Sequence, residues 1–125
     1  MKAGKLYFVI PCYTEEAVLP ETSARLGEML AGLIEKGLAA AGSRIVFVDD
    51  GSKDGTWECI KALHDGNSVF SGVRLSRNRG HQNALIAGLS AGVNYADITI
   101  TMDADLQDDI NAVEKMLEKY YGGRD

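Results

Sequence analysis

The sequence has little of several features that mark other classes of protein. Two cysteines, Cys12 and Cys59, in 125 residues are too few for a disulfide framework or a zinc site of cysteine ligands, so a reducing compartment is expected. No apolar run approaches the ~18 to 20 residues that cross a bilayer. The net charge of −5 argues against a basic face that holds nucleic acid. These absences predict a soluble, cytosolic protein.

The overall composition is that of an ordinary globular domain. Hydrophobic residues make up 46% of the chain and charged residues 25%. A chain of this length can bury one hydrophobic core. Because there is no repeat, linker or low-complexity tract, residues 1–125 are interpreted as one domain.

The main pattern is an alternation of short apolar runs with stretches of helical period. Four β-favouring runs predict buried strands at residues 6–10, 44–48, 69–75 and 97–102. A helical pattern follows each run, around residues 26–34, 57–63, 84–92 and 110–120. Pro20 suits the first turn of the first helix, and Gly37 suits its end. Four such units predict an α/β fold, a Rossmann-like parallel sheet with helices on both faces.

Polar side chains follow all four predicted strands, and three of these four tips are acidic. The tips comprise residues 11–16, 49–54, 76–81 and 103–109. In an open parallel sheet, ligands bind beyond the carboxyl ends of the strands. We therefore expect the functional site at this edge.

The chemistry of these tips suits a metal ion and a diphosphate. Asp103, Asp105 and Gln107 are two residues apart, so in an extended segment their oxygens project to one side. Mg²⁺ and Mn²⁺ prefer carboxylate and amide oxygens. Arg77 and Arg79, after the third strand, suit phosphate oxygens. Acidic and basic tips at one edge therefore indicate a metal-bridged diphosphate.

Simpler interpretations exist for each of these residues. Asp49 to Ser52 could form only a turn followed by a helix cap from Asp54 or Thr56. Arg77 could be a solvated surface charge. Trp57 fits the hydrophobic core better than a sugar-binding platform.

Four segments together resemble the nucleotide-sugar half of a family-two inverting glycosyltransferase of the A-type fold. They read VIPCYTEE (9–16), IVFVDDGSKDGT (45–56), LSRNRGHQNALIAGLSAG (75–92) and ITMDADLQDD (100–109). The branch that they most resemble is that of the polyprenyl-phosphate sugar transferases, the bactoprenol glucosyltransferase and dolichol-phosphate mannose synthase type. The resemblance covers the chain from Leu6 to about Tyr121.

The resemblance implies two sets of site residues. The nucleotide-sugar-binding set is Pro11, Tyr13, Glu15, Asp49, Asp50, Arg77 and Asp103. The set that would ligate Mg²⁺ or Mn²⁺ is Asp103, Asp105 and Gln107. One position departs from the family pattern, because Thr14 stands where the family usually has asparagine after the tyrosine.

The resemblance also implies an activity and its partners. The donor would be a UDP- or GDP-sugar, and the acceptor a polyprenyl phosphate or a glycan of the cell envelope, reached at the cytoplasmic face of the membrane. Family catalytic domains run to about twice the ~100 to 150 residues of a typical domain. We therefore expect residues 1–125 to be the donor-binding half, active in transfer only weakly or not at all, with the catalytic base beyond Asp125.

Two other hypotheses remain open from the sequence. One is a non-catalytic module that binds a nucleotide or a partner through the same edge. The other is a phosphatase of the haloacid-dehalogenase type with Asp103 as nucleophile, although MDADLQ lacks the Thr or Val common in that motif. A dinucleotide oxidoreductase is disfavoured because the sequence has no G-x-G-x-x-G loop.

Overall fold

The computed structural model describes residues 4–75, 97–102, 113 and 115–119. Four strands form one parallel sheet in the order β3-β2-β1-β4. The strands are β1 (Leu6–Cys12), β2 (Arg44–Asp49), β3 (Phe70–Arg74) and β4 (Ile98–Thr101). The helices are α1 (Leu19–Glu35) and α2 (Thr56–Gly66), and residues 113 and 115–119 are also helical. The predicted α/β fold with a parallel sheet is confirmed.

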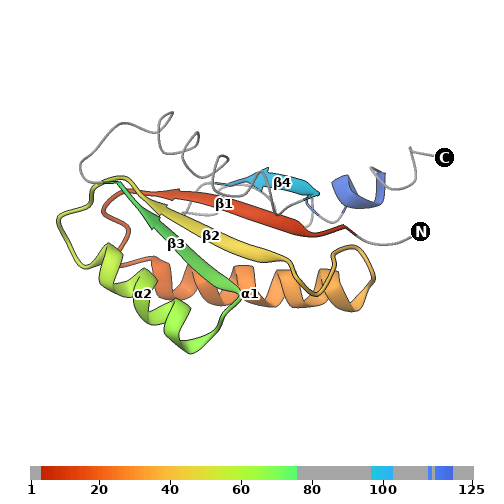
Figure 1. Cartoon of the computed structure of the whole chain (residues 1–125), viewed down its shortest axis with the longest axis horizontal. Helices are drawn as coiled ribbons and strands as arrows, with labels where there is room; N and C mark the ends of the chain where they lie inside the picture. The colour runs from red at the N-terminus through yellow and green to blue at the C-terminus, as the bar shows by residue number, and fades with distance from the viewer. Residues whose placement is uncertain (1–3, 76–96, 103–112, 114, 120–125) are drawn as a thin grey trace.

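The described helices α1 and α2 lie on the same face of the sheet (Figure 1). Alternate side chains of β1 and β2, such as Phe8 and Phe47, pack into the core that this face shares with the helices. The residues between them, Val9, Val46 and Val48, form a second buried cluster on the opposite face. Both faces of the central strands are therefore buried, as their continuous apolar sequences predict. The helix predicted at residues 84–92 lies outside the described residues.

The sheet order places a topological switch beside β1. From β1 the chain continues to β2 and then β3 on one side, whereas β4 pairs with β1 on the other side. The carboxyl ends of neighbouring strands are level, because Cys12 pairs with Asp49, and Asp49 with Arg74. The crevice at such a switch is the usual ligand site of an open α/β sheet.

The helix α1 begins and ends where Pro20 and Gly37 predict. Pro20 occupies the first turn, where its missing N–H leaves no hydrogen bond unmade. Gly37, just beyond the helix, has φ 77°, a left-handed conformation that glycine adopts without strain.

Ser43 fixes the opposite, amino-terminal end of the sheet. Its side chain is fully buried. The Oγ atom donates a hydrogen bond to Ala40 O at 2.7 Å and accepts one from Leu6 N at 2.8 Å. The hydroxyl therefore satisfies two buried backbone groups where β1 begins.

The Gly72→Ala substitution should destabilise the protein by about 1–3 kcal/mol, because α2 packs closely against β3. A Cβ atom on Gly72 would lie 2.5 Å from Ile60 Cγ2 and 3.1 Å from Trp57 Cζ3. Ile60 is buried, and its branch at Cβ leaves that methyl group little freedom to move. Urea unfolding measures the effect.

The control for this prediction is Gly32→Ala, in the interior of α1. A Cβ there meets nothing within 4 Å, so the substitution should stabilise the protein by roughly 0.5–1 kcal/mol through helix propensity. Equal effects of the two substitutions would contradict the close packing of α2 on β3.

Candidate functional site

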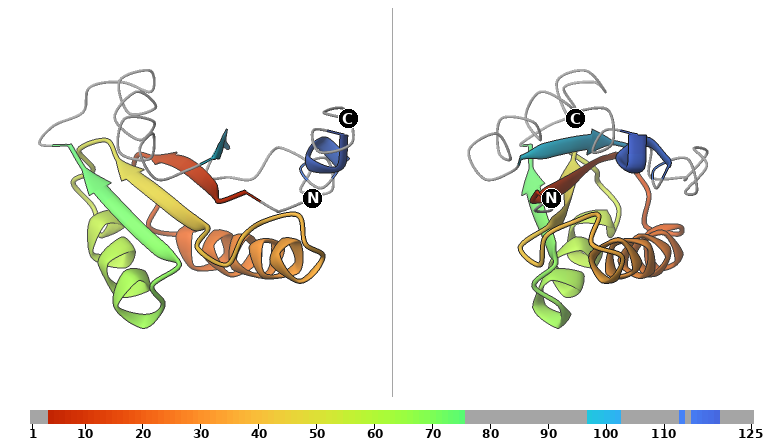
Figure 2. Two further views of the ribbon diagram at one scale, coloured as in Figure 1. Left: turned by 45° about the vertical axis from the view of Figure 1, so that its right-hand side comes forward. Right: turned by 90° about the vertical axis from the view of Figure 1, so that its right-hand side faces the viewer.

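Two loops leave the same end of the sheet (Figure 2). The first loop, residues 13–18, joins β1 to α1, and the second loop, residues 50–55, joins β2 to α2. They begin side by side, since Asp50 N donates a hydrogen bond to Cys12 O at 2.9 Å. The predicted convergence of the first two strand tips is therefore present.

Three further hydrogen bonds, which we call the cross-loop contacts, join the first loop to the segment from Ser52 to Thr56. They run from Thr14 N to Ser52 Oγ (2.9 Å), from Glu15 N to Thr56 Oγ1 (3.0 Å) and from Gly55 N to Glu16 Oε1 (2.8 Å). The side chains of Ser52 and Thr56 are buried. The two loops therefore form one hydrogen-bonded unit.

Thr14 has a strained backbone. Its φ of 52° lies in the left-handed region, where a β-branched side chain is rarely found. Its Oγ1 donates to Tyr13 O at 2.7 Å. Asparagine, the residue that the family usually has here, adopts this conformation more readily. The departure noted in the sequence therefore has a conformational consequence as well as the loss of an amide.

Substituting Thr14→Asn should stabilise the protein by about 1 kcal/mol, since it relieves part of the left-handed strain. Thermal unfolding should show a rise of a few degrees. The control Thr14→Val keeps the branched side chain and removes the hydroxyl, so it should not stabilise. A melting temperature lowered by Thr14→Asn would argue against strain at this residue.

The structure describes three predicted residues on β1 and the first loop. Pro11 is buried within β1 opposite Val48, and Glu15 is half-buried, with its carbonyl accepting the first hydrogen bonds of the turn into α1. Tyr13 is 45% exposed. An exposed phenol ring at a strand end can stack against a planar base.

Asp49 and Asp50 are both buried at the end of β2. Asp49 Oδ1 accepts a hydrogen bond from Ser52 N at 3.0 Å, so this carboxylate shapes the second loop, in line with the turn interpretation. Its Oδ2 lies 3.8 Å from Arg74 Nε and has no hydrogen bond among the described residues. Asp50 follows it, with its backbone fixed on Cys12. Donor binding by either carboxylate stays a prediction.

Arg74 is a candidate that the sequence argument missed. It ends β3, its side chain is half exposed, and its guanidinium lies 5.8 Å from the ring centre of Trp57. The predicted cation of this tip was Arg77, because Arg74 falls within the apolar run. Val73 and Leu75 both pack on the other face of the sheet. Because side chains alternate along a strand, this pattern could have identified Arg74 from the sequence as a residue of the opposite face.

Asp54 forms hydrogen bonds with Thr56, the first residue of α2. Its Oδ1 accepts hydrogen bonds from the Thr56 hydroxyl and from Thr56 N, the latter at 3.0 Å. The bond from that hydroxyl, together with backbone N–H groups, holds the pKa of Asp54 below its ordinary value. The residue that caps α2 is Gly55, which makes no side-chain cap hydrogen bond, so the cap predicted at Asp54 or Thr56 is wrong, and Asp54 instead contacts the first residue of the helix.

Neither cysteine is suited to nucleophilic chemistry. Burial, then the negative charges of Glu15 and Asp49, raises the pKa of the Cys12 thiol far above its ordinary value. Burial and the charge of Glu16 likewise raise the pKa of Cys59. At neutral pH both thiols stay protonated.

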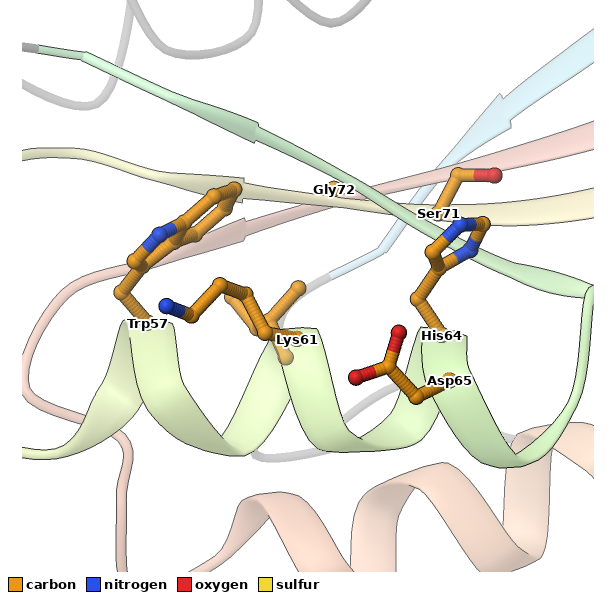
Figure 3. A pocket seen from close by; sticks show the side chains of 7 residues that line it. Trp57, Lys61, His64, Asp65, Ser71 and Gly72 are labelled. Carbon is orange, nitrogen blue, oxygen red and sulfur yellow. The ribbon is translucent and has the colours of Figure 1, made fainter.

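A separate groove of about 430 Å³ runs along α2 below β3 (Figure 3). Its lining comprises Trp57, Ile60, Lys61, His64, Asp65, Ser71 and Gly72. His64 Nδ1 lies 2.7 Å from Phe70 O, which places this ring against the first residue of β3. Trp57 also packs against the core, as its sequence context predicted.

The remaining predicted residues, Arg77, Asp103, Asp105 and Gln107, lie outside the described residues. Within the described part of the chain, no group of three or more His, Cys, Asp or Glu side chains is placed to hold a metal ion. Met102 directly precedes the segment predicted to bind the metal ion. It is buried, and its backbone N–H donates a hydrogen bond to Val9 O at 3.1 Å. Among the described helices, none has the length and apolar character to span a bilayer.

Comparison with known proteins gives one family and several relatives. The profile of Glycosyl transferase family 2 matches residues 7–125. An uncharacterized glycosyltransferase, YkoT, of Bacillus subtilis is 48% identical over 118 residues, covering 94% of this chain and 35% of that protein. The undecaprenyl-phosphate 4-deoxy-4-formamido-L-arabinose transferase of Pseudomonas aeruginosa is 40% identical, covering 94% and 32%.

Another relative, the bactoprenol glucosyl transferase of Shigella phage SfX, is 33% identical and covers 97% of this chain and 37% of that protein. Relatives of this chain thus include polyprenyl-phosphate sugar transferases. The chain spans about a third of the length of these curated relatives.

Solved structures share the fold at low sequence identity. The mannosyltransferase PcManGT from Pyrobaculum calidifontis, solved in complex with GDP-Man and Mn²⁺, superposes with a TM-score of 0.67 at 20% identity, covering 84% of this chain and 28% of that one. TarS of S. aureus superposes with a TM-score of 0.55 at 20% identity, covering 81% and 16%. Both support a parallel sheet of the glycosyltransferase A type.

Proposed function

This chain belongs to glycosyl transferase family 2, and we propose that it binds the sugar donor in an enzyme that transfers a sugar, with inversion, to polyprenyl phosphate. The donor is a nucleoside diphosphate sugar. Relatives named for undecaprenyl phosphate and bactoprenol support this acceptor, and a structural neighbour solved with GDP-Man and Mn²⁺ supports the donor and the ion. A glycan acceptor is the alternative that the transfer assay distinguishes.

The observation that carries the proposal is the joining of two loops at the carboxyl ends of β1 and β2. Their contacts hold Tyr13, with an exposed ring, beside the segment that starts at Asp50. A planar aromatic surface next to a carboxylate suits a nucleoside, whose base stacks and whose N–H and hydroxyl groups donate hydrogen bonds.

In this proposal the nucleoside binds to Pro11, Tyr13, Glu15, Asp49 and Asp50. Asp49 Oδ2 is a buried oxygen without a hydrogen bond among the described residues, and its charge faces the Arg74 guanidinium at 3.8 Å. Arg77 approaches the diphosphate, because a guanidinium offers paired N–H donors to phosphate oxygens.

Asp103, Asp105 and Gln107 would hold the metal ion in this proposal. Two carboxylates and an amide oxygen fit Mg²⁺ or Mn²⁺, which completes its coordination with water and phosphate oxygens. When bound, the ion stabilises the negative charge that builds on the diphosphate leaving group. Met102, hydrogen-bonded to Val9, starts this segment from the strand beside the first loop.

The chemistry of the acceptor determines which further residues the sugar-transfer reaction requires. A polyprenyl phosphate oxygen is already anionic, so this acceptor needs little general-base assistance. The residues of this chain would then bind and orient the donor.

Isothermal titration calorimetry on the full-length protein tests the proposal. We expect UDP or GDP to bind, with an affinity at least about tenfold higher in Mn²⁺ than in EDTA, since an ion held by Asp103, Asp105 and Gln107 would supply positive charge to the diphosphate. Absent binding, or binding that Mn²⁺ does not change, would contradict the donor site. Sugar transfer to undecaprenyl phosphate, measured with the same donor, separates an enzyme from a non-catalytic nucleotide-binding module.

A further inference from the structure

We infer that Ser52, Thr56 and Glu16 are positioning residues that hold the first loop in a strained conformation and so aim Tyr13 at the donor. The inference rests on the proposed donor site but concerns residues that have no assigned role in it. Their side chains make the three cross-loop contacts, and all three contacts end on backbone N–H groups.

The backbone of Thr14 is strained. A β-branched residue with φ 52° is unfavourable by itself and persists only where surrounding contacts impose it. The N–H of Thr14 is held by Ser52 Oγ, and the next N–H, of Glu15, is held by Thr56 Oγ1. The contacts therefore fix the peptide groups on both sides of the strained residue.

The side chains that supply these contacts are themselves fixed. Thr56 is fully buried, and its hydroxyl donates to Asp54 Oδ1 while it accepts from Glu15 N. Ser52 is held through its own N–H, which donates to Asp49 Oδ1 at 3.0 Å. The first loop is thus attached to the end of β2 and to the first turn of α2.

Glu16 makes the contact in the opposite direction. Its Oε1 accepts a hydrogen bond from Gly55 N at 2.8 Å. A Cβ atom on Gly55 would lie 2.8 Å from the Glu16 carboxylate, so a residue with a side chain would displace it. The absence of a side chain at position 55 is therefore part of this contact.

The consequence for Tyr13 follows from its neighbours in the chain. Cys12 on one side belongs to β1, and Thr14 on the other side is held by Ser52. Because Cys12 O also accepts the hydrogen bond from Asp50 N, Tyr13 and Asp50 keep a fixed relation. The cross-loop contacts thus fix the backbone after Tyr13, a partly exposed residue, at the start of the loop that follows Asp50.

The test compares two substitutions that each remove a buried hydroxyl. Thr56→Val keeps the side-chain shape and loses the acceptor for Glu15 N, so the affinity for UDP or GDP with Mn²⁺ should fall about tenfold. Ser43→Ala loses a hydroxyl of similar burial at the other end of the sheet. Its affinity should stay within about twofold of wild type, because the change is remote from the loops.

Conservative variants distinguish positioning from general stability. Thr56→Ser keeps the hydroxyl and should restore most of the affinity, whereas Glu16→Gln keeps an acceptor for Gly55 N and should bind better than Glu16→Ala. Calorimetry is done on the full-length protein at a temperature at which circular dichroism shows every variant folded. If Thr56→Val does not fold, Ser52→Ala against Ser43→Ala gives the same comparison.

The outcomes separate this inference from the proposed function. If wild type binds neither nucleotide, the proposed function fails and the inference with it. If wild type binds and Thr56→Val or Ser52→Ala binds equally well, or no worse than Ser43→Ala, only the inference is overturned. A loss confined to the loop variants and reversed by Thr56→Ser supports it.

Discussion

Asp105→Asn should lower the affinity for UDP or GDP in Mn²⁺ by at least about tenfold, to the level seen in EDTA. The substitution replaces a charged metal ligand with a neutral amide, whereas even outer-shell changes at metal sites typically cost about 10- to 100-fold. The melting temperature should change little, because removing one of several crowded carboxylates also relieves repulsion. Calorimetry with each nucleotide and a circular dichroism melt measure the two effects.

The matched control for Asp105→Asn is Asp108→Asn, which makes the same change of charge three residues later. Asp108 precedes the helix predicted around residues 110–120, where a carboxylate favours the helix dipole, and it is not among the predicted metal ligands. Asp108→Asn should therefore keep Mn²⁺-dependent binding. Equal losses in the two variants would refute a specific ligand role for Asp105, and a collapsed fold with binding retained would make Asp105 structural.

Asp50→Ala should weaken nucleotide binding by about 10- to 100-fold, the effect of losing a charged hydrogen-bond acceptor. Asp50 is buried beside the first loop, and its backbone is fixed on Cys12 O at 2.9 Å. Binding of Mn²⁺ alone, followed by the electron paramagnetic resonance signal of the free ion, should be unchanged. The nucleoside and the metal would then have separable determinants.

Asp65→Ala is the control for Asp50→Ala, because it removes an exposed carboxylate from the α2 groove without touching either loop. It should leave nucleotide affinity unchanged. A comparable loss from Asp65→Ala would indicate a general charge effect, and a loss of Mn²⁺ affinity in Asp50→Ala would contradict the division of roles.

The strands could be predicted from sequence because their burial is continuous. Residues 6–10 and 45–48 are apolar on both faces, so β1 and β2 can be recognised without knowing which face of each strand is buried. In the third apolar run, residues 69–75, the sequence predicts a strand less strongly, because the run is interrupted by Ser71 and by Gly72. The structure gives that residue a packing role instead, since α2 approaches β3 too closely for a side chain there.

The start of α1 shows a limit of hydrophobic periodicity. The apolar spacing begins at Leu26, yet the helix begins at Leu19 and buries Thr22 and Ser23 in its first turns. Ser23 Oγ satisfies its hydrogen bond on Pro20 O at 3.0 Å, so a polar side chain can face the core there. A pattern that counts only apolar residues misses such positions.

The site was predictable where it depends on topology and not where it depends on loop geometry. Parallel strands bring their carboxyl ends together, so Tyr13 and Asp50 could be placed at one edge from sequence. The cross-loop contacts join residues about forty positions apart, such as Glu15 and Thr56, through a side chain and a backbone N–H. No residue pattern encodes such a contact, so Ser52, Thr56 and Glu16 became apparent only in the structure.

The central claim is that one divalent ion and the two joined loops bind the same nucleoside diphosphate. A crystal structure of the full-length protein with Mn²⁺ and the nucleotide that binds tests it most directly, because anomalous scattering locates the ion. We predict a manganese peak shared by the Asp105 carboxylate and the diphosphate, with the base beside Tyr13 and Asp50. A nucleotide bound instead in the groove between Trp57 and Asp65, or a manganese peak remote from Asp105, would contradict the claim.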